Sequence, residues 1–204
     1  MICTSKVATN TAAQNRHREH TERTACEQCG HRNYHHHYYR QPSYMVINGK
    51  VFFDGHIVEG ASATNFKVLR NGYTKDAWAV YYWGTKIDGA QSSTFNDLDY
   101  GYAKDSWNVY HNGVKMEGAS ANSFTILTDG FAKDDWNVYF YGGTIPEAKP
   151  STFTLLTDGY AKDTWHVYFD GTIIPEAQAS SFIVLKHGYA KGNYNTYYYG
   201  KRID

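Results

Sequence analysis

Two cysteines near the start of the chain have the spacing of a zinc site. Cys26 and Cys29 form a C-x2-C-G pattern, in which two thiolates can hold one tetrahedral zinc ion. Three histidines lie close enough in the sequence to complete the ligand set: His17, His20 and His31. This spacing matches no standard zinc finger, so a redox-labile dithiol or a tail without chemistry are the alternatives. Zinc is the one cofactor that the sequence suggests.

A second candidate for chemistry is a lysine–aspartate pair that recurs along the rest of the chain. The copies are Lys75-Asp76, Lys104-Asp105, Lys133-Asp134 and Lys162-Asp163. An active site is a single constellation of residues, so copied pairs favour a structural role, either a turn or a ladder of ion pairs. The chain also has no G-x-S-x-G nucleophile motif and no phosphate-binding glycine loop. The sequence therefore predicts no enzymatic activity.

Aromatic residues follow each of these pairs and could bind a ligand. Tryptophan and tyrosine side chains with Asp and Asn beside them can hold carbohydrate. Trp107 and Val109 are two residues apart, as are their equivalents in the other copies, which would place them on the same face of a strand. This pattern predicts that both residues belong to the core. The tyrosines on the opposite face, which we expect to be partly exposed if a ligand surface exists, are Tyr110, Tyr139 and Tyr168.

These motifs recur with a fixed period of 29 residues, which is visible in the glycines that precede them. The glycines are Gly72, Gly101, Gly130, Gly159 and Gly188. A fixed period of this size is typical of a repeat architecture. The units are 44–72, 73–101, 102–130, 131–159 and 160–188, and a half unit spans 189–204. The first unit is atypical, as expected for a capping or interface repeat, because it has Gly49 where the others have an aromatic residue.

Each unit has the pattern of short β-strands. Trp136, Val138 and Phe140 alternate with other residues at period two, and Gly142-Gly143 is a tight-hairpin signal. We expect three short strands per unit and an all-β fold, in which single units cannot bury their own apolar faces. The predicted architecture is an elongated stacked array of β-repeats, and a closed ring of small β-units is the alternative.

The chain divides into two regions near residue 43. Residues 1–43 form a polar arm that contains all three cysteines, with 6 basic and 3 acidic residues. This arm has too little apolar periodicity to bury a core by itself. Residues 44–204 form the β-repeat domain, with 14 basic and 17 acidic residues.

The repeated phrase resembles a known family. Gly-Tyr-Ala-Lys-Asp-x-Trp-x-Val-Tyr, followed by x-x-Gly and later by Ser-Phe-x-x-Leu, is similar to the repeats of the DKNYY family of bacterial proteins over residues 44–204. Tryptophan or tyrosine stands here where that family often has a polar residue or asparagine. The resemblance implies an all-β repeat and no established chemistry.

The two ends of the repeat domain offer unpaired strand edges, and such edges recruit further strands. A second copy could supply them, either head-to-tail or through the arm of residues 1–43, and contacts of this kind produce filaments. The residues expected at this interface are Tyr44, Val46, Tyr194, Tyr197, Tyr199 and Ile203. The first hypothesis is therefore a structural, self-assembling subunit of an extracellular or cell-surface fibre. The alternative is a monomeric repeat module that binds glycan or protein through an aromatic surface.

Composition limits the remaining partners and the location. The formal net charge is zero, so no global field attracts nucleic acid, and no apolar run reaches the roughly 20 residues of a membrane helix. The first residues lack the apolar core of a secretory signal. We expect an extracellular or cell-surface location, with the cytoplasm as the alternative.

Overall fold

The computed structural model describes residues 43–204, and every regular element in this range is a β-strand. The first sheet has three antiparallel strands, in the order β1 (Tyr44–Ile47), β2 (Lys50–Phe53) and β3 (His56–Ser62). In the part of the chain that the structure describes, no helix is long and apolar enough to cross a membrane. The prediction of an all-β repeat fold is confirmed.

Five sheets of four short antiparallel strands follow the first one. In chain order they contain β4 (Lys67–Val68), β5 (Tyr73–Lys75), β6 (Val80–Tyr82) and β7 (Thr85–Lys86); β8 (Asn96–Asp97), β9 (Tyr102–Lys104), β10 (Val109–His111) and β11 (Val114–Lys115); β12 (Thr125–Ile126), β13 (Phe131–Lys133), β14 (Val138–Phe140) and β15 (Gly143–Thr144); β16 (Thr154–Leu155), β17 (Tyr160–Lys162), β18 (Val167–Phe169) and β19 (Thr172–Ile173); and β20 (Ile183–Val184), β21 (Tyr189–Lys191), β22 (Thr196–Tyr198) and β23 (Lys201–Arg202). Neighbours in each sheet are also neighbours in the chain, so every sheet is a simple meander.

The strands are short because tight turns interrupt them at both ends. Between β10 and β11 the turn is Asn112-Gly113, and both residues have positive φ angles, 49° and 77°. This is the conformation that a two-residue hairpin requires and that Asn-Gly adopts readily. Gly113 is also required for space, because a Cβ atom there would lie 2.5 Å from the ring of Tyr82 in the preceding sheet. The glycine hairpin therefore sets both the turn and the close approach of neighbouring sheets.

The hydrophobic core is divided into layers, each lying between two successive sheets. From the sheet of β8–β11, Ala103 and Tyr110 pack against the preceding sheet, whereas Tyr102 and Val109 pack against the following one. The period-two alternation of a strand thus buries both of its faces, each against a different neighbour. No sheet can bury both faces alone, so the stability of each unit depends on the units beside it.

A tyrosine hydroxyl in most layers joins one sheet to the next. Tyr102 donates a hydrogen bond to the carbonyl of Gly130 (3.1 Å) and accepts one from the backbone N–H of Gly142 (2.8 Å). Tyr73 makes the same two bonds to Gly101 and Gly113, and Tyr160 makes them to Gly188 and Gly200. Burial raises the pKa of Tyr102 to about 12, so the hydroxyl keeps the proton that it donates. Phe131 occupies this position in the remaining inner layer and has no hydroxyl.

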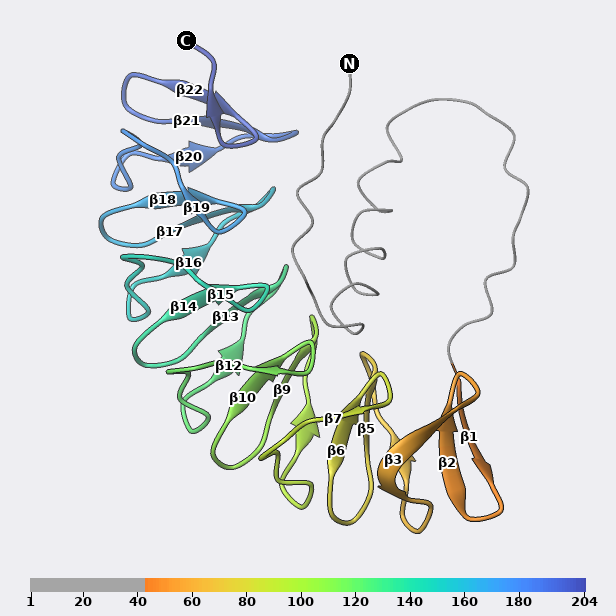
Figure 1. Ribbon diagram of the computed structural model, residues 1–204. Helices are drawn as coiled ribbons and strands as arrows, with labels where there is room; N and C mark the ends of the chain where they lie inside the picture. The colour runs from red at the N-terminus through yellow and green to blue at the C-terminus, as the bar shows by residue number, and fades with distance from the viewer. Residues whose placement is uncertain (1–42) are drawn as a thin grey trace, which may run out of the picture.

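The stacked sheets form an open arc, with the first and last sheets at opposite ends (Figure 1). The β9–β10 turn and its equivalents lie along the outer, convex side, and the glycine hairpins point to the inner side. The outer side of each unit also carries a longer loop, such as 116–124, whereas the inner side has only tight turns. Each unit is therefore wider on the outside, which accounts for the direction of the curvature. The arc agrees with the predicted stacked array and not with the closed ring.

The structure differs from the sequence prediction in the number and position of the strands. Each of the five later sheets has four strands instead of three. The additional strand is the Tyr-Ala-Lys segment, for example β9, which follows directly on the positive-φ pair Tyr100-Gly101. Its partner β10 begins at Val109 and not at Trp107. This shift decides where the tryptophans lie.

Candidate binding surface

The turn between β9 and β10 is organised by the side chain of Asp105. One carboxylate oxygen accepts hydrogen bonds from the backbone N–H groups of Trp107 and Asn108, each at 2.8 Å. The backbone N–H of Asp105 donates to the carbonyl of Asn108 at 3.0 Å and closes the turn. An aspartate that caps its own turn in this way is a common turn former. Trp107 is therefore part of a turn and lies outside the alternating strand.

The second oxygen of the same carboxylate connects the turn to two other segments. It accepts hydrogen bonds from the hydroxyl of Tyr110 and from the backbone N–H of Gln91, each at 2.9 Å. Burial alone would raise the pKa of the Asp105 carboxyl, but the four hydrogen bonds outweigh it and hold the pKa below its usual value. Burial also raises the pKa of Tyr110, so its hydroxyl remains a donor. The equivalent aspartates with the same four donors are Asp76, Asp134 and Asp163.

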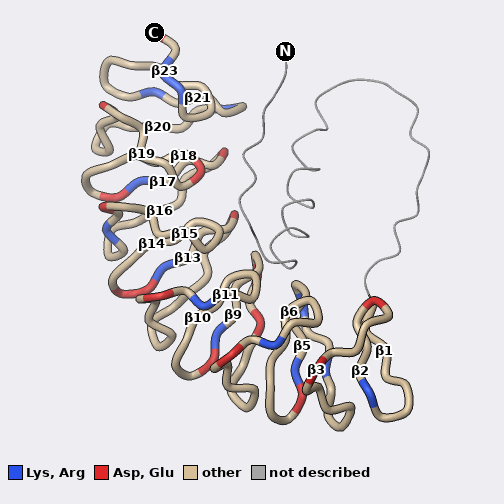
Figure 2. The backbone as a smooth tube through the Cα atoms, in the orientation of Figure 1, with Lys and Arg blue, Asp and Glu red and all other residues tan. Residues whose placement is uncertain are grey.

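The lysines of the repeated pairs have a different role from the one that an ion-pair ladder implies. The Lys104 ammonium donates to the carbonyls of Ala121 (3.0 Å) and Phe124 (3.2 Å), in the loop that leads to the next sheet. Lys75 does the same with Ser92 and Phe95, each at 2.9 Å. Lysine and aspartate thus lie next to each other at the ends of β5, β9, β13 and β17, as Figure 2 shows, but they bind separate partners. The expected turn is present, and the expected ladder of Lys–Asp ion pairs is not found among residues 43–204.

The turn places one large aromatic side chain of each later unit in solvent. We call these residues the aromatic row: Trp78, Trp107, Trp136, Trp165 and Tyr194, with 85, 71, 76, 69 and 84% of their surface exposed. They occupy equivalent turns on the convex side of the arc (Figure 1). The prediction that the tryptophans belong to the core is wrong, because the strand alternation begins only after the turn.

The tyrosines proposed as a ligand surface are buried instead. Tyr110, Tyr139 and Tyr168 are at most 1% exposed, and their hydroxyls bind the turn aspartates. They lie on the second face of each strand, and that face packs against the preceding sheet. A ligand surface formed by these tyrosines is therefore excluded in the folded domain. The useful signal in the sequence was the aspartate two residues before each tryptophan, since Asp at that spacing forms turns.

Polar residues flank the rings of the aromatic row, except that of Trp78, which lies between Ala77 and Ala79. On the two sides of Trp107 and Trp136 stand Ser106 and Asn108, and Asp135 and Asn137, all exposed or half-buried. Trp165 lies between Thr164 and His166, and the His166 ring is 3.7 Å from the carboxylate of Glu147. Glu147 belongs to the loop of the preceding unit, so loops and turns meet at this surface. The row therefore combines exposed rings with hydrogen-bonding groups that carry little positive charge.

A shallow groove of about 240 Å³ lies beside the first of these turns. Its lining residues come from two successive units: Asn65, Lys67, Lys75, Asp76, Ala77, Ser92 and Ser93. In the next unit Thr94 accepts a hydrogen bond from the backbone N–H of Ser106 at 3.1 Å. Asn65 occupies the position of Thr94 in the first such turn.

The residues predicted at the assembly interface have mixed environments. Val46, Tyr194, Tyr199 and Ile203 are exposed, as an interface would require. Tyr197 is only 1% exposed, because its side chain packs in the last core layer. Tyr44 is half-buried and its hydroxyl accepts a hydrogen bond from Gly84 at 2.7 Å. Tyr197 is therefore removed from the interface, and Tyr44 belongs mainly to the first core layer.

The predicted zinc ligands lie outside the described residues. Cys26, Cys29, His17, His20 and His31 are all in the arm, and zinc binding there stays a prediction. Within residues 43–204, no group of three or more His, Cys, Asp or Glu side chains is arranged to hold a metal ion.

The fold and the aromatic row together define a tandem β-repeat protein in which every core layer is shared by two units. Residues 44–172 match the model of the DKNYY family, and the chain belongs to this family. The match covers more than half of the 204 residues and ends within the unit 160–188. No curated protein and no solved structure matches the chain.

Proposed function

We propose that the repeat domain is a non-catalytic binding module that holds an extended partner along the aromatic row. The observation that supports this most strongly is the exposure of a large aromatic side chain at the same turn of successive units. Exposed aromatic surface is unfavourable in water, and here it recurs at one fixed position and is not scattered over the surface. Tryptophan and tyrosine are also the side chains most enriched among residues that dominate binding.

The rings of the aromatic row lie outside the core of the domain. None of them belongs to one of the five core layers. Among the described residues, no ring contact involves Trp78, Trp107, Trp136 or Trp165. Packing within the domain therefore does not explain why these turns carry tryptophan. Contact with a partner would explain it.

The titratable groups of each turn support binding in preference to catalysis. The buried aspartates, for example Asp134, already accept four hydrogen bonds and have little capacity left for a reacting group. An extracellular or cell-surface location fits a row that is open along its whole length, because long partners are accessible there. Fractionation of cells followed by antibody detection tests this location, and a signal confined to the cytoplasm would contradict it.

Display of random peptides and an array of glycans test the binding function. The wild-type chain is compared with a variant in which the four tryptophans of the row are replaced by alanine. A ligand that binds the wild-type chain and not the variant supports the proposal. If both proteins bind the same ligands, or neither binds any, the row is not a binding surface. Tyr141→Ala is the matched control, because Tyr141 is exposed and belongs to the hairpin between β14 and β15, and these hairpins point to the inner side of the arc (Figure 1).

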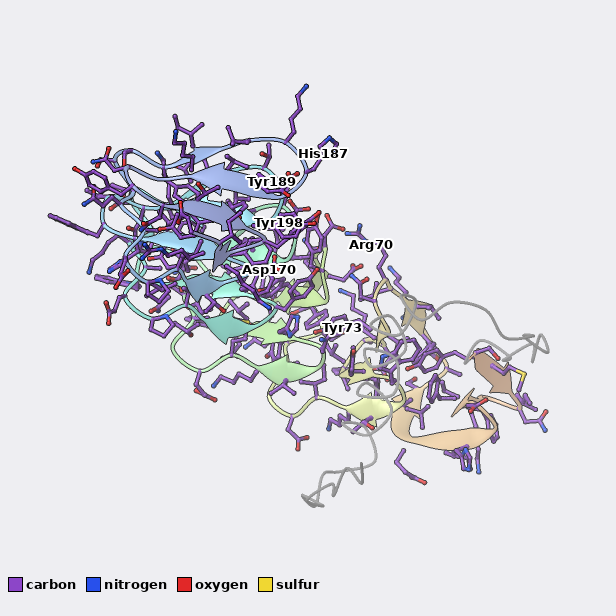
Figure 3. The ribbon with its side chains drawn as sticks, turned by 90° about the horizontal axis from the view of Figure 1, so that it is seen from above. Arg70, Tyr73, Asp170, His187, Tyr189 and Tyr198 are labelled. Atoms are coloured by element: carbon purple, nitrogen blue, oxygen red, sulfur yellow. The ribbon has the colours of Figure 1, made fainter. Side chains whose placement is uncertain are left out.

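Self-association into a fibre is the second candidate function, and the two end sheets favour it. On the last described sheet Tyr189 is 43% exposed, whereas the equivalent Tyr160 is 1% exposed between two sheets. Its ring stacks on Tyr198 at a centroid distance of 4.7 Å, and Figure 3 shows both at this end of the arc. The first sheet likewise exposes Val46 and Ile47. A second copy that joined these faces would complete a core layer, and repeated joining would produce a filament.

Sedimentation separates this second candidate from a single-chain module. Assembly through the end sheets predicts large particles for the wild-type chain and short or monomeric particles for Tyr189→Lys. Deletion of residues 1–43 tests the contribution of the arm. If both changed proteins still form long fibres, neither the last sheet nor the arm is the connector.

A further inference from the structure

We propose that the partner of the aromatic row is an uncharged linear polysaccharide. This inference rests on the proposed binding function and adds the chemical class of the ligand. The first observation that supports it is that the row repeats the same exposed aromatic position in successive units. Equivalent sites at regular intervals are best filled by a ligand that is itself built of identical residues, because each added contact then becomes intramolecular.

The distance between successive sites suits such a chain. Sheets that pack face to face lie about 10 Å apart, so successive rings of the row are separated by about this distance or somewhat more on the convex side. This step corresponds to the length of a disaccharide in an extended glycan. One sugar of each pair can therefore stack on a ring while the other bridges to the next unit.

The chemistry beside the rings matches the edges of a sugar. A pyranose has an apolar face that can lie on an indole and a rim of hydroxyl groups that both donate and accept hydrogen bonds. Asn108 and Asn137 follow Trp107 and Trp136 in the same turns, and their side chains are half-buried. Each amide hydrogen-bonds the hydroxyl of a buried tyrosine, Tyr110 or Tyr139, and an amide has a further donor and an acceptor for a sugar hydroxyl. Ser106 and Thr164 add hydroxyls at the preceding position. Polar groups thus accompany the rings of Trp107, Trp136 and Trp165, whereas Trp78 lies between Ala77 and Ala79.

The charges near the row disfavour acidic glycans. The nearest repeated cations, such as Lys104 and Lys133, have ammonium groups bound to loop carbonyls and are half-buried. The loops on the same side expose the carboxylates of Asp88, Glu117, Glu147 and Glu176 and one ammonium group, that of Lys149. Like charges repel, so a polysaccharide that carries carboxylates or sulfates would bind more weakly than a neutral one.

The arrangement of the rings also favours a glycan over a proline-rich peptide. Peptides in the polyproline II conformation dock into grooves lined by adjacent aromatic side chains. Each tryptophan of the row stands without a ring partner among the described residues. A single exposed ring offers a flat surface for one sugar and no slot for a proline.

The test measures binding of the full chain to a panel of purified polymers, by retention in a gel that contains the polymer and by tryptophan fluorescence. The neutral members are β-1,4-glucan, β-1,3-glucan, mannan and soluble chitin oligosaccharides. Alginate and heparan sulfate represent acidic glycans, and a polyproline peptide represents peptides. The proteins are the wild-type chain, the double variant Trp107→Ala/Trp136→Ala and the control Tyr141→Ala.

We expect at least one neutral polymer to bind, with an affinity that rises with its length. The double variant should bind that polymer about 100-fold more weakly, if each ring contributes about tenfold, and the control should match the wild-type chain. Tighter binding of an acidic glycan or of polyproline, or no binding of any neutral member, overturns the inference. If a displayed peptide still binds the wild-type chain and not the tryptophan variants, the row remains a binding surface and only the class of ligand is wrong. If no ligand distinguishes the variants, the proposed function fails as well.

Discussion

Asp134 and Trp136 lie two residues apart in the same turn, yet their environments are opposite. Asp134 is 3% exposed and accepts four hydrogen bonds, whereas Trp136 is 76% exposed and belongs to no core layer. Both recur with the same period, so repetition alone does not separate a residue that holds the fold from one that meets a partner. The aspartate column stabilises the turn, and the turn presents the tryptophan.

The last unit shows that the two columns are separable. Gly192 replaces the aspartate there, and the turn is closed only by its backbone N–H, which donates to the carbonyl of Asn195 at 2.8 Å. Tyr194 nevertheless remains 84% exposed. The presentation of an aromatic side chain thus persists without the buried carboxylate, which supports different roles for the two columns.

Acid should produce the largest change in stability, because it acts on the whole aspartate column at once. The pKa values of Asp76, Asp105, Asp134 and Asp163 are lower in the folded protein than their ordinary value. Their stabilisation is therefore fully present above the pKa of an unfolded aspartate, about 3.9, and is lost as the pH falls through the lower folded values. We expect the melting temperature to fall steeply below about pH 4. The melting temperature is measured by circular dichroism at a series of pH values from neutral to strongly acidic.

A less steep fall in the variant Asp134→Asn would confirm that this column carries the effect. The same acid dependence in the wild-type chain and the variant would assign it to other groups.

Removal of one carboxylate should have the next largest effect. Asp134→Ala leaves the N–H groups of Ser120, Trp136 and Asn137 and the hydroxyl of Tyr139 without their acceptor. Unsatisfied buried donors cost about 1–3 kcal/mol each, and partial hydration of the turn reduces the total, so we expect a loss of about 3 kcal/mol. Urea denaturation measures the free energy of unfolding. The exposed neighbour Asp135 provides the control, since Asp135→Ala should change stability by less than about 0.5 kcal/mol. Equal effects of the two substitutions would contradict the assignment.

A smaller and opposite effect is expected from the substitution Phe131→Tyr. The new hydroxyl would lie where the hydroxyls of Tyr102 and Tyr160 bind a glycine carbonyl and a glycine N–H, here those of Gly159 and Gly171. Hydrogen bonds of this kind contribute about 1 kcal/mol each, and we expect a net gain of about 1 kcal/mol. Urea denaturation measures this gain, and Tyr102→Phe should produce a loss of similar size. No gain would mean that the layer around Phe131 has adapted to a ring without a hydroxyl.

The sequence was sufficient to predict the repeat and its class of fold. The period of 29 residues, the valine of each strand and the Asn112-Gly113 hairpin are all local signals, and each agrees with the structure. The prediction of three strands missed one because Tyr102–Lys104 is too short to show a period. Local pattern therefore predicts the elements that have clear turns at both ends.

The candidate surface could not be predicted, because it depends on where the alternation begins and on how sheets stack. Trp107 and Val109 are in phase in the sequence, but the side chain of Asp105 bends the chain between them. Tyr110 is on the face that an isolated sheet would expose, and only the preceding sheet buries it. Both features depend on tertiary structure, so they could not be predicted from the sequence of a single chain.

The smallest effect on stability should come from the tryptophan column, and this prediction separates the two columns most sharply. If Trp136 were a core residue, Trp136→Ala would cost about 3–5 kcal/mol. An exposed side chain outside every core layer should instead change the free energy of unfolding by less than about 0.5 kcal/mol, as measured by urea denaturation. The matched partner is Asp134→Ala, which alters the same turn. If Trp136→Ala leaves the free energy of unfolding nearly unchanged while Asp134→Ala lowers it strongly, the tryptophan ring serves a purpose other than folding.

A loss above about 2 kcal/mol for Trp136→Ala would instead place the ring in a contact that stabilises the turn, since losses of this size come from buried groups. The aromatic row would then lose its strongest support as a binding surface.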